Sequence, residues 1–275
     1  MLKTFLLNIW KDSAILNNNL LQSLIDPVNK ARILDVGCGT GQLIIERVAK
    51  INKPEIYAVE IDQQFFKEAK NKGIKVTKAN IEKGFPYKDN FFDIVSANQI
   101  IEHVVDVDFF MEEIYRVLKP KGYLVLSTEN LSSWHNIFAL LLGWQAFSQH
   151  ISLKKNIGNP LKLNINRSSK NYDSHIKIFT PKGLKELIEL YHFKITNFYG
   201  AGYYPFGGKL SKILSGLDST HCAFIGLKAI KKSSRWLQTF RLLNQNREKL
   251  ITDQSWYLNT RIKKLFLKTN QTAKK

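Results

Sequence analysis

Cysteine is nearly absent from this chain, which contains two among its 275 residues. Cys38 and Cys222 do not have the spacing of metal ligands, and two thiols without a secretory signal are typical of a reducing cytoplasm. The apolar stretch at residues 5–10 is interrupted by Asn8 and followed by Lys11, so it is too short for an export signal. We therefore expect a cytoplasmic protein without a disulfide framework.

Several catalytic patterns are also missing. The sequence has no P-loop, no nucleophilic triad, no cluster with metal-ligand spacing and no internal repeat. We therefore expect neither a bound metal nor a covalent nucleophile of the hydrolase type.

No apolar run is long enough to cross a membrane, although residues 130–153 contain no Asp, Glu, Lys or Arg. A spanning helix needs ~20 mostly apolar residues, and the uninterrupted apolar part is about half that length. We expect an insertion over the mouth of a binding crevice, either as a cap on a pocket or facing a membrane. A helix buried in the core of the domain is the alternative.

Acidic residues are scarce, because 23 Asp and Glu accompany 41 Lys and Arg and the net charge is +18. Residues 228–275 hold 13 of the cations against Glu248 and Asp253, a net +11. Apolar residues interleave with these cations at roughly helical spacing, which predicts a basic amphipathic segment on an anionic surface. A helix packed on the domain and a nucleic-acid partner remain as alternatives, the latter the weaker.

The most informative segment is residues 31–46, where an apolar strand pattern leads into three alternating glycines and then a helix pattern. Gly37, Gly39 and Gly41 lack Cβ atoms, so the turn can adopt positive φ and let a ligand lie against backbone amides. A dinucleotide fingerprint needs its third glycine where this chain has Gln42. The segment predicts a nucleotide-type site of another kind, with a plain tight turn as the alternative.

Polar residues follow the next three apolar runs. Glu60 ends the second run, where a carboxylate can accept both hydroxyls of a ribose. Asn80 follows the third run, and Asn98 and Gln99 follow the fourth. Helix patterns separate these runs, which predicts a parallel sheet covered on both faces, with a ligand at the carboxyl ends of its strands.

Residues 31–130 resemble the class I S-adenosylmethionine-dependent methyltransferases, in the small-molecule branch (type 11) that includes the ubiquinone- and biotin-pathway enzymes. The resemblance rests on five motifs in order, from the Gly-x-Gly-x-Gly turn to the Leu-Lys-Pro-Lys-Gly turn at residues 118–122 and the strand expected at 123–128. It implies a Rossmann-like α/β fold, with a seven-stranded, mostly parallel sheet and helices on both faces. It also implies S-adenosyl-L-methionine as the cofactor.

The same resemblance implies roles for single residues. Asp35 would hold the methionine ammonium, directly or through water, and Glu60 the ribose hydroxyls. Asn80 would meet the adenine amino group, while the backbone N–H of Ile81 meets the ring. Cys38 is interpreted as a small residue in the turn. The expected cofactor-binding residues are Asp35, Gly37, Cys38, Gly39, Thr40, Gly41, Glu60, Ile61, Asn80, Ile81, Asn98 and Gln99.

Residues 175–193 resemble the last helix of such a domain, with Thr180 as its N-cap and Pro181 at its first position. Strands expected at 194–199 and 223–230 would complete the sheet. Residues 1–30 are predicted to form a helical lid, with its helix at 13–26. Residues 31–232 are predicted to form the methyltransferase domain, with a helical insertion at 130–172. Residues 233–275 are predicted to form a basic amphipathic helical extension.

His103 is the candidate general base, because it follows the fourth strand at the rim of the crevice with Glu102 beside it. A histidine that caps the local turn or packs on a helix is the structural alternative, and His175 is a second candidate base. The fifth strand departs from the family, which usually has Ser-Thr-Pro-Asn where this chain has Ser-Thr-Glu129-Asn130. A carboxylate therefore replaces a rigid turn residue on the acceptor side.

The Asn/Asp-Pro-Pro-aromatic motif of enzymes that methylate base amino groups is missing, which argues against DNA amino-methylation. We expect methyl transfer to a small-molecule or lipid-linked acceptor, most simply at oxygen, with the chain cytoplasmic or peripheral on the inner face of a membrane. The alternatives are an RNA methyltransferase that uses the basic tail, and a non-catalytic module that binds the cofactor.

Overall fold

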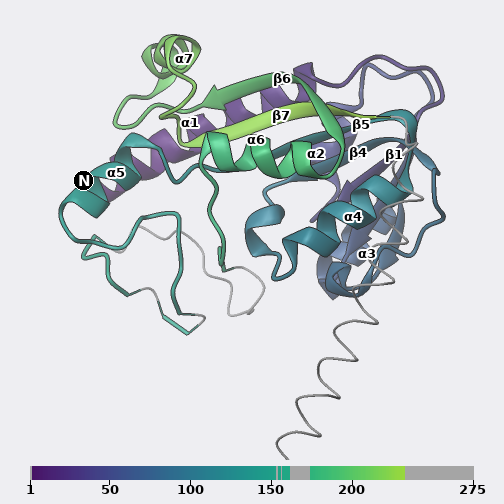
Figure 1. Ribbon diagram of the computed structural model, residues 1–275, viewed down its shortest axis with the longest axis horizontal. Helices are drawn as coiled ribbons and strands as arrows, with labels where there is room; N and C mark the ends of the chain where they lie inside the picture. Colours follow the sequence, from purple (N-terminus) through teal and green to yellow (C-terminus); the bar gives the residue numbers. More distant parts are fainter. Residues whose placement is uncertain (1, 153, 156, 162–173, 233–275) are drawn as a thin grey trace, which may run out of the picture. The chain divides into compact units, whose positions relative to one another are not determined.

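The computed structural model describes residues 2–152, 154–155, 157–161 and 174–232. Its centre is one seven-stranded sheet with the strand order β3-β2-β1-β4-β5-β7-β6 (Figure 1). β7 runs antiparallel to both neighbours and the other pairs are parallel, which confirms the seven-stranded, mostly parallel sheet that the resemblance implied. The strands are β1 (Arg32–Val36), β2 (Glu55–Glu60), β3 (Lys75–Lys78), β4 (Phe92–Asn98), β5 (Leu118–Glu129), β6 (Phe193–Ala201) and β7 (Phe224–Lys231).

Helices cover the sheet on both faces, with α4 and α6 on the near side in Figure 1 and α1 behind β6 and β7. The sequence sets several helix starts: Asp62 accepts from the backbone N–H groups of Gln64 and Phe65, and Thr180 from that of Gly183. The helices are α1 (Leu2–Ser23), α2 (Gln42–Arg47), α3 (Gln63–Asn71), α4 (Val107–Val117), α5 (Trp134–Leu141), α6 (Pro181–Leu190) and α7 (Gly208–Leu217), with 3₁₀ turns η1 (Ile81–Lys83) and η2 (Ile101–His103).

The core runs along the central strands. Ile33 and Leu34 of β1, Ile94 of β4, and Leu124 and Val125 of β5 have no exposed surface. Strands covered on both faces read as continuous apolar runs rather than as alternating patterns. This is why the central strands were predictable from the sequence.

Two boundaries differ from the prediction. α1 begins at Leu2 instead of residue 13, because the apolar residues near the start are part of the helix and Ile9 is 3% exposed. β5 begins at Leu118, within the predicted turn, because Leu118 pairs with Phe92 across an irregularity in the β4–β5 ladder. Tyr199 of β6 also donates from its hydroxyl to Asn17 Oδ1 of α1 at 2.9 Å, which ties the first helix to the last part of the sheet.

Parts of two predicted segments lie outside the described residues. The insertion predicted at 130–172 contains α5, but its residues 153, 156 and 162–173 are not described, and neither is the predicted extension at 233–275. Among the described helices, none combines the length and apolarity that crossing a membrane requires.

The parallel strands end at one edge of the sheet, which we call the carboxyl edge. The glycine turn follows β1 there, η2 lies just beyond β4, and α5 follows β5. β7 begins at this edge, because Phe224 pairs with both Glu129 and Ala201, the last residues of β5 and β6. The predicted site residues therefore share one edge of the molecule.

Candidate functional site

The glycine turn leaves one open position beside two packed ones. Gly37, Gly39 and Gly41 have φ angles of 71°, 53° and 74°, in the left-handed region that favours glycine. A Cβ atom on Gly41 would lie 2.3 Å from Ile74 Cδ1, and one on Gly37 would lie 2.7 Å from Ile100 Cδ1. No atom lies within 4 Å of the same position on Gly39. The turn therefore offers bare backbone at Gly39, which fits a bound nucleoside.

Glu60 lies against this turn. It is 7% exposed, and its Oε2 accepts from the Gly39 N–H at 2.8 Å while Oε1 accepts from the Asp62 N–H at 2.8 Å. Each carboxylate oxygen can accept more than one hydrogen bond, so both remain suited to ribose hydroxyls. Ile61, the next residue, is 42% exposed and can cover a ligand from the outer side.

Asp35 and Cys38 are buried below the turn. Burial raises the pKa of Asp35, and the nearby Arg47 guanidinium opposes that shift. Burial also raises the pKa of the Cys38 thiol well above its ordinary value, so it stays protonated and unreactive. Thr40 contributes its carbonyl oxygen to a hydrogen bond from Lys72 Nζ at 3.0 Å. These residues shape the turn, and Asp35 supplies its negative charge.

The remaining cofactor candidates have local partners. Asn80 caps η1, because its Oδ1 accepts from the Glu82 N–H at 3.0 Å, and Ile81 follows it. Asn98 Oδ1 accepts from Ser127 Oγ at 2.5 Å. Gln99 has a φ of 54°, a strained conformation for a side chain of this size and one that is frequent at functional sites.

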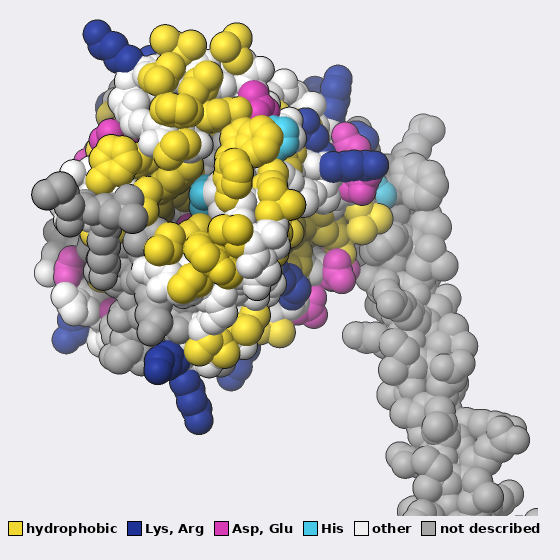
Figure 2. All heavy atoms as spheres, turned by 90° about the vertical axis from the view of Figure 1, so that its left-hand side faces the viewer, with side chains coloured by type: hydrophobic (Ala, Val, Ile, Leu, Met, Phe, Trp, Pro, Cys, Tyr) yellow, Lys and Arg dark blue, Asp and Glu magenta, His cyan; other side chains and the backbone are white. Residues whose placement is uncertain are grey.

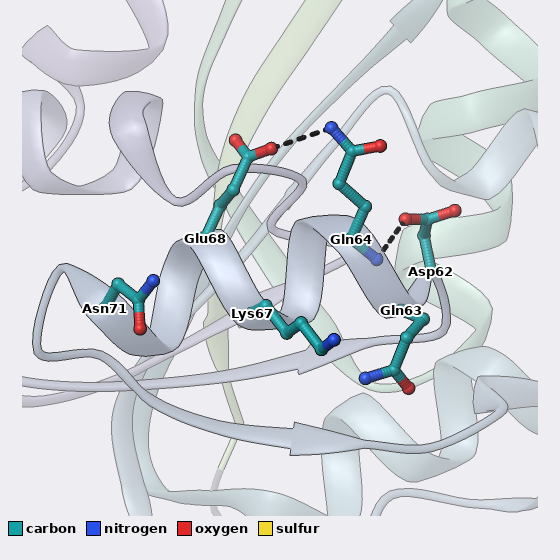
Figure 3. A pocket seen from close by; sticks show the side chains of 6 residues that line it. All are labelled: Asp62, Gln63, Gln64, Lys67, Glu68 and Asn71. Atoms are coloured by element: carbon teal, nitrogen blue, oxygen red, sulfur yellow. Dashed lines mark hydrogen bonds between the residues drawn. The ribbon is translucent and has the colours of Figure 1, made fainter.

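A separate surface depression of about 410 Å³ lies along α3 (Figure 3). In Figure 3, Gln64 donates to Glu68 at 3.0 Å, and Asp62 is used as the helix cap. The depression is lined by polar side chains of a single helix, and we assign no ligand to it. Its lining residues are Asp62, Gln63, Gln64, Lys67, Glu68 and Asn71.

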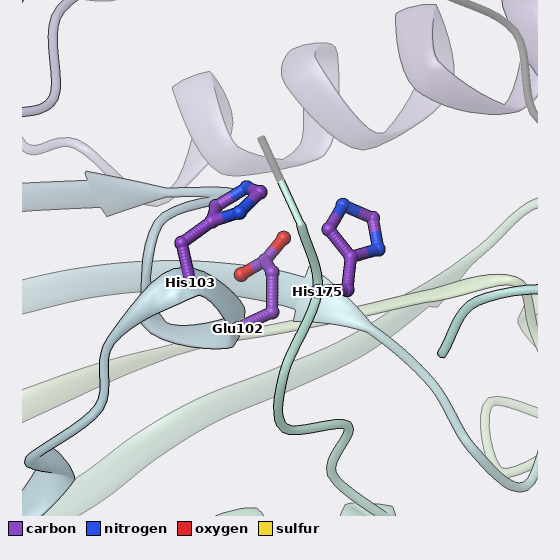
Figure 4. A group of neighbouring side chains, drawn as sticks. All are labelled: Glu102, His103 and His175. Atoms are coloured by element: carbon purple, nitrogen blue, oxygen red, sulfur yellow. The ribbon is translucent and has the colours of Figure 1, made fainter. Parts of the chain in front are cut away.

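The fold brings His103 and His175 together at the carboxyl edge, with Glu102 between them (Figure 4). The two ring centroids lie 4.8 Å apart, although the residues come from η2 and from the segment before α6. His103 Nδ1 lies 3.2 Å from the carbonyl oxygen of Ser174. Because a carbonyl only accepts, Nδ1 of His103 donates to it, and in a singly protonated ring the lone pair is then on Nε2. That is the form a general base needs.

Glu129, the departure seen in the fifth strand, is the counter-ion of His175. Its Oε2 lies 3.6 Å from His175 Nδ1, and the same nitrogen lies 2.9 Å from the Ser148 carbonyl oxygen. Burial alone would lower the pKa of His175, but Glu129 outweighs burial and raises it to about 9. Burial disfavours ionisation of Glu129, but His175 outweighs it and lowers the pKa of that carboxyl. His175 is therefore a cation at neutral pH.

Glu102 is the second buried carboxyl of this cluster. Burial raises its pKa to about 7. Thr128 Oγ1 donates to its Oε2 at 2.9 Å, and the Gln99 amide, oriented to satisfy both of its neighbours, donates to Oε1 at 3.0 Å. His135 lies close by, and burial lowers its pKa to about 4, so it is neutral. Glu129 thus has a neutral imidazole, His135, and a cationic one, His175, in its surroundings.

Sequence spacing could not show this cluster. The potential ligand atoms of Glu102, His103 and His175 lie within 4.8 Å of one another, a set of two imidazoles and a carboxylate that could hold a metal. The sequence predicted no metal cluster, because His175 is remote in the chain. The Glu129–His175 pair was missed for the same reason, and its only sequence signal was an unexpected carboxylate.

The Glu129–His175 pair predicts how stability depends on pH. A histidine with a raised pKa stabilises the fold fully below pH ~6.5, and this contribution is lost as the pH rises towards 9. We expect the free energy of unfolding to fall by about 1–3 kcal/mol across that window. Urea unfolding of the wild type and His175→Gln at several pH values measures it.

The variant should lack this part of the pH dependence. Glu55→Gln is the control, since Lys75 lowers the pKa of this carboxyl, which therefore titrates below this pH window, and the variant should keep the wild-type slope. An unchanged slope in His175→Gln would contradict the assigned charge.

Comparisons with known proteins address the same region. Residues 34–126 match the family model described as a methyltransferase domain of type 11. The chain is 32% identical over 108 residues to the ubiquinone biosynthesis O-methyltransferase of Rhizobium johnstonii, covering 38% of this chain and 43% of that protein. It is 24% identical over 206 residues to the mitochondrial ubiquinone biosynthesis O-methyltransferase of Bos taurus, covering 70% of this chain and 50% of that protein.

The chain thus spans half or less of the length of these relatives. A solved S-adenosylmethionine-dependent methyltransferase from Thermotoga maritima has the same fold, with a TM-score of 0.53 at 18% identity over 82% of this chain and 91% of that one. Family model, relatives, strand order and open glycine turn agree that residues 34–126 form a class I S-adenosylmethionine-dependent methyltransferase domain of the type 11 branch.

Proposed function

We propose that this protein transfers a methyl group from S-adenosylmethionine to an oxygen atom of a small-molecule or lipid-linked acceptor. The observation that carries the proposal is the pairing of His103 with the cationic His175 at the carboxyl edge, where their ring centroids lie 4.8 Å apart. The sulfonium of the bound cofactor supplies an activated methyl group. An acceptor hydroxyl must lose its proton as it attacks, and His103 Nε2 takes that proton as the general base.

His175 stabilises the developing charge in this proposal. Its imidazolium, fixed by Glu129 and the Ser148 carbonyl, favours negative charge on the acceptor oxygen. Two imidazolium rings 4.8 Å apart repel each other, so the charge stays on the ring beside Glu129 and His103 keeps its lone pair. Both relatives are named O-methyltransferases, which supports oxygen as the accepting atom.

The test is transfer of a labelled methyl group. The purified protein is incubated with labelled S-adenosylmethionine and separate lipid, small-molecule, glycan and RNA fractions of a cell extract. Label in a lipid or small-molecule product at oxygen supports the proposal. Label in RNA would favour an RNA methyltransferase, and tight cofactor binding without transfer to any fraction would favour a non-catalytic binding module.

An anionic membrane is the proposed place of the reaction. Figure 2 shows the side of the molecule with α5 and α7, where apolar side chains gather around a hollow and Lys or Arg side chains lie at the margins. Leu141 and Leu142 are 75% and 62% exposed, and Ile213 and Leu217 of α7 are 60% and 80% exposed. Adjacent apolar and basic surfaces bind a charged interface together. The open crevice would then face a lipid-linked acceptor.

We expect the chain to bind anionic vesicles at low salt and to lose this binding as salt screens the charges. Truncation after Lys232 removes most of the basic segment and should abolish the salt-sensitive part while cofactor binding remains. Leu141→Asp combined with Leu142→Asp should lower vesicle partitioning about tenfold. Sedimentation with vesicles of graded anionic lipid content measures both effects.

The matched control is Leu190→Asp, since Leu190 is 62% exposed at the end of α6, near the start of β6 and opposite the carboxyl edge. It should bind vesicles as the wild type does. A wild type that ignores anionic vesicles at low salt but shifts RNA would exclude the membrane and assign the basic segment to a nucleic-acid partner.

A further inference from the structure

Arg47, the last residue of α2, is a buried arginine with an incomplete set of partners. It is 2% exposed. Its Nε donates to Asn18 Oδ1 of α1 at 2.7 Å, and its Nη1 donates to Ser96 Oγ at 3.4 Å and lies 3.9 Å from Asp35 Oδ1. Its Nη2 is buried and has no hydrogen-bond partner within the described part of the chain.

Nη2 of Arg47 therefore needs a hydrogen-bond acceptor. A guanidinium has five N–H donors and no acceptor, and a buried charged donor without a partner is costly. Burial lowers the pKa of Arg47, and the nearby Asp35 opposes that shift. The acceptor that a planar guanidinium matches best is a carboxylate, which it can bind through two parallel hydrogen bonds.

The position of Arg47 indicates which ligand could supply this carboxylate. Asp35 and Ser96 are paired across β1 and β4, just inside the carboxyl edge and directly below the glycine turn. The methionine part of the cofactor is a zwitterion, so it needs a carboxylate for its ammonium and a cation for its own carboxylate. Asp35 and Arg47 supply these opposite charges side by side.

We propose that Arg47 binds the carboxylate of the methionine moiety through Nη2, while Asp35 faces the ammonium. The proposal rests on the cofactor of the proposed reaction. Asn18 of α1 accepts from Arg47 Nε, so α1 helps to position this guanidinium although α1 is remote from the sequence motifs. An arginine inside a short helix gives no such signal in the sequence.

Calorimetry with three adenosine thioethers tests this assignment without any methyl acceptor. S-Adenosylhomocysteine carries both charged groups, its decarboxylated analogue keeps only the ammonium, and 5′-methylthioadenosine has neither. We expect the wild type to bind S-adenosylhomocysteine at least tenfold more tightly than the decarboxylated analogue. Arg47→Gln should weaken binding of S-adenosylhomocysteine about 10–100-fold and leave the other two ligands within about threefold.

Parallel losses for S-adenosylhomocysteine and the decarboxylated analogue would overturn the proposal, because Arg47 would then act only through Asp35. Arg47→Lys keeps the charge without the planar fork and should give an intermediate loss, which also serves if Arg47→Gln does not fold. Arg116→Gln is the control. It removes an arginine of α4 that pairs with Glu113 and Asp89, and it should leave the affinity for all three ligands unchanged.

The affinities of the wild type for the three ligands also test the proposal. Equal affinity for S-adenosylhomocysteine and the decarboxylated analogue would overturn the role of Arg47 but keep the cofactor. No binding of any of the three ligands would overturn the cofactor assignment and the role of Arg47 together.

Discussion

His103→Ala is expected to lower turnover by ~10²–10⁴-fold while affinity for S-adenosylhomocysteine remains unchanged. The reason is geometric. Nδ1 of His103 is held by the Ser174 carbonyl at 3.2 Å, so only Nε2 can receive the proton of an acceptor hydroxyl. Single-turnover transfer of labelled methyl groups, with calorimetry on the same variant, separates loss of chemistry from loss of binding.

His221→Ala is the control for this result. His221 stacks on Trp134 and pairs with Asp218, apart from the His103–His175 cluster, so its removal should leave turnover within a few-fold. If His103→Ala also kept turnover within a few-fold, His103 would be structural, and methyl transfer would depend on alignment of the reactants alone.

Glu60→Ala should weaken binding of S-adenosylhomocysteine by about 1.5–3 kcal/mol, roughly 10–150-fold. Two ribose hydroxyls would lose their charged acceptor, and the Gly39 N–H would lose the partner that holds the open part of the turn. Titration calorimetry at constant salt gives this difference, with circular dichroism to show that the variant is folded.

Glu55→Ala provides the comparison on the same strand. Glu55 begins β2, and its Oε2 pairs with Lys75 at 2.7 Å on an exposed surface, so cofactor affinity should not change. Unchanged affinity in a folded Glu60→Ala protein would mean that the ribose lies elsewhere. Binding of NAD by the wild type would contradict the cofactor assignment itself.

The parts of the site that were predictable depend on short stretches of sequence. A strand followed by alternating glycines determines the turn, and Glu60 is placed beside Gly39 because parallel strands end at one edge. The caps of α3 and α6 are equally local, because Asp62 and Thr180 bind backbone groups two or three residues away. Such features need no knowledge of the rest of the chain.

The parts that were not predictable depend on contacts between distant segments. Glu129 gains its role from His175, and Arg47 gains its role from Asn18, and neither partner is adjacent in sequence. A buried ion pair and a surface one have the same sequence pattern, and only tertiary packing distinguishes them. The early start of α1 is of the same kind, because burial of Ile9 on the folded domain decides it.

The hydrogen bond from Tyr199 to Asn17 connects β6, near the end of the domain, to α1 at its start, next to the residues around Arg47. Asn17 in turn donates to Ser127 at 3.0 Å, and its neighbour Asn18 holds Arg47. A fragment of residues 31–130 would retain all five motifs but lack both α1 and β6. It would therefore also lack Asn18, the hydrogen-bond partner of Arg47 on α1. Ligand binding then requires the whole domain to be folded. A ligand at 100 times its Kd would therefore add about 2.7 kcal/mol to the free energy of unfolding of the domain.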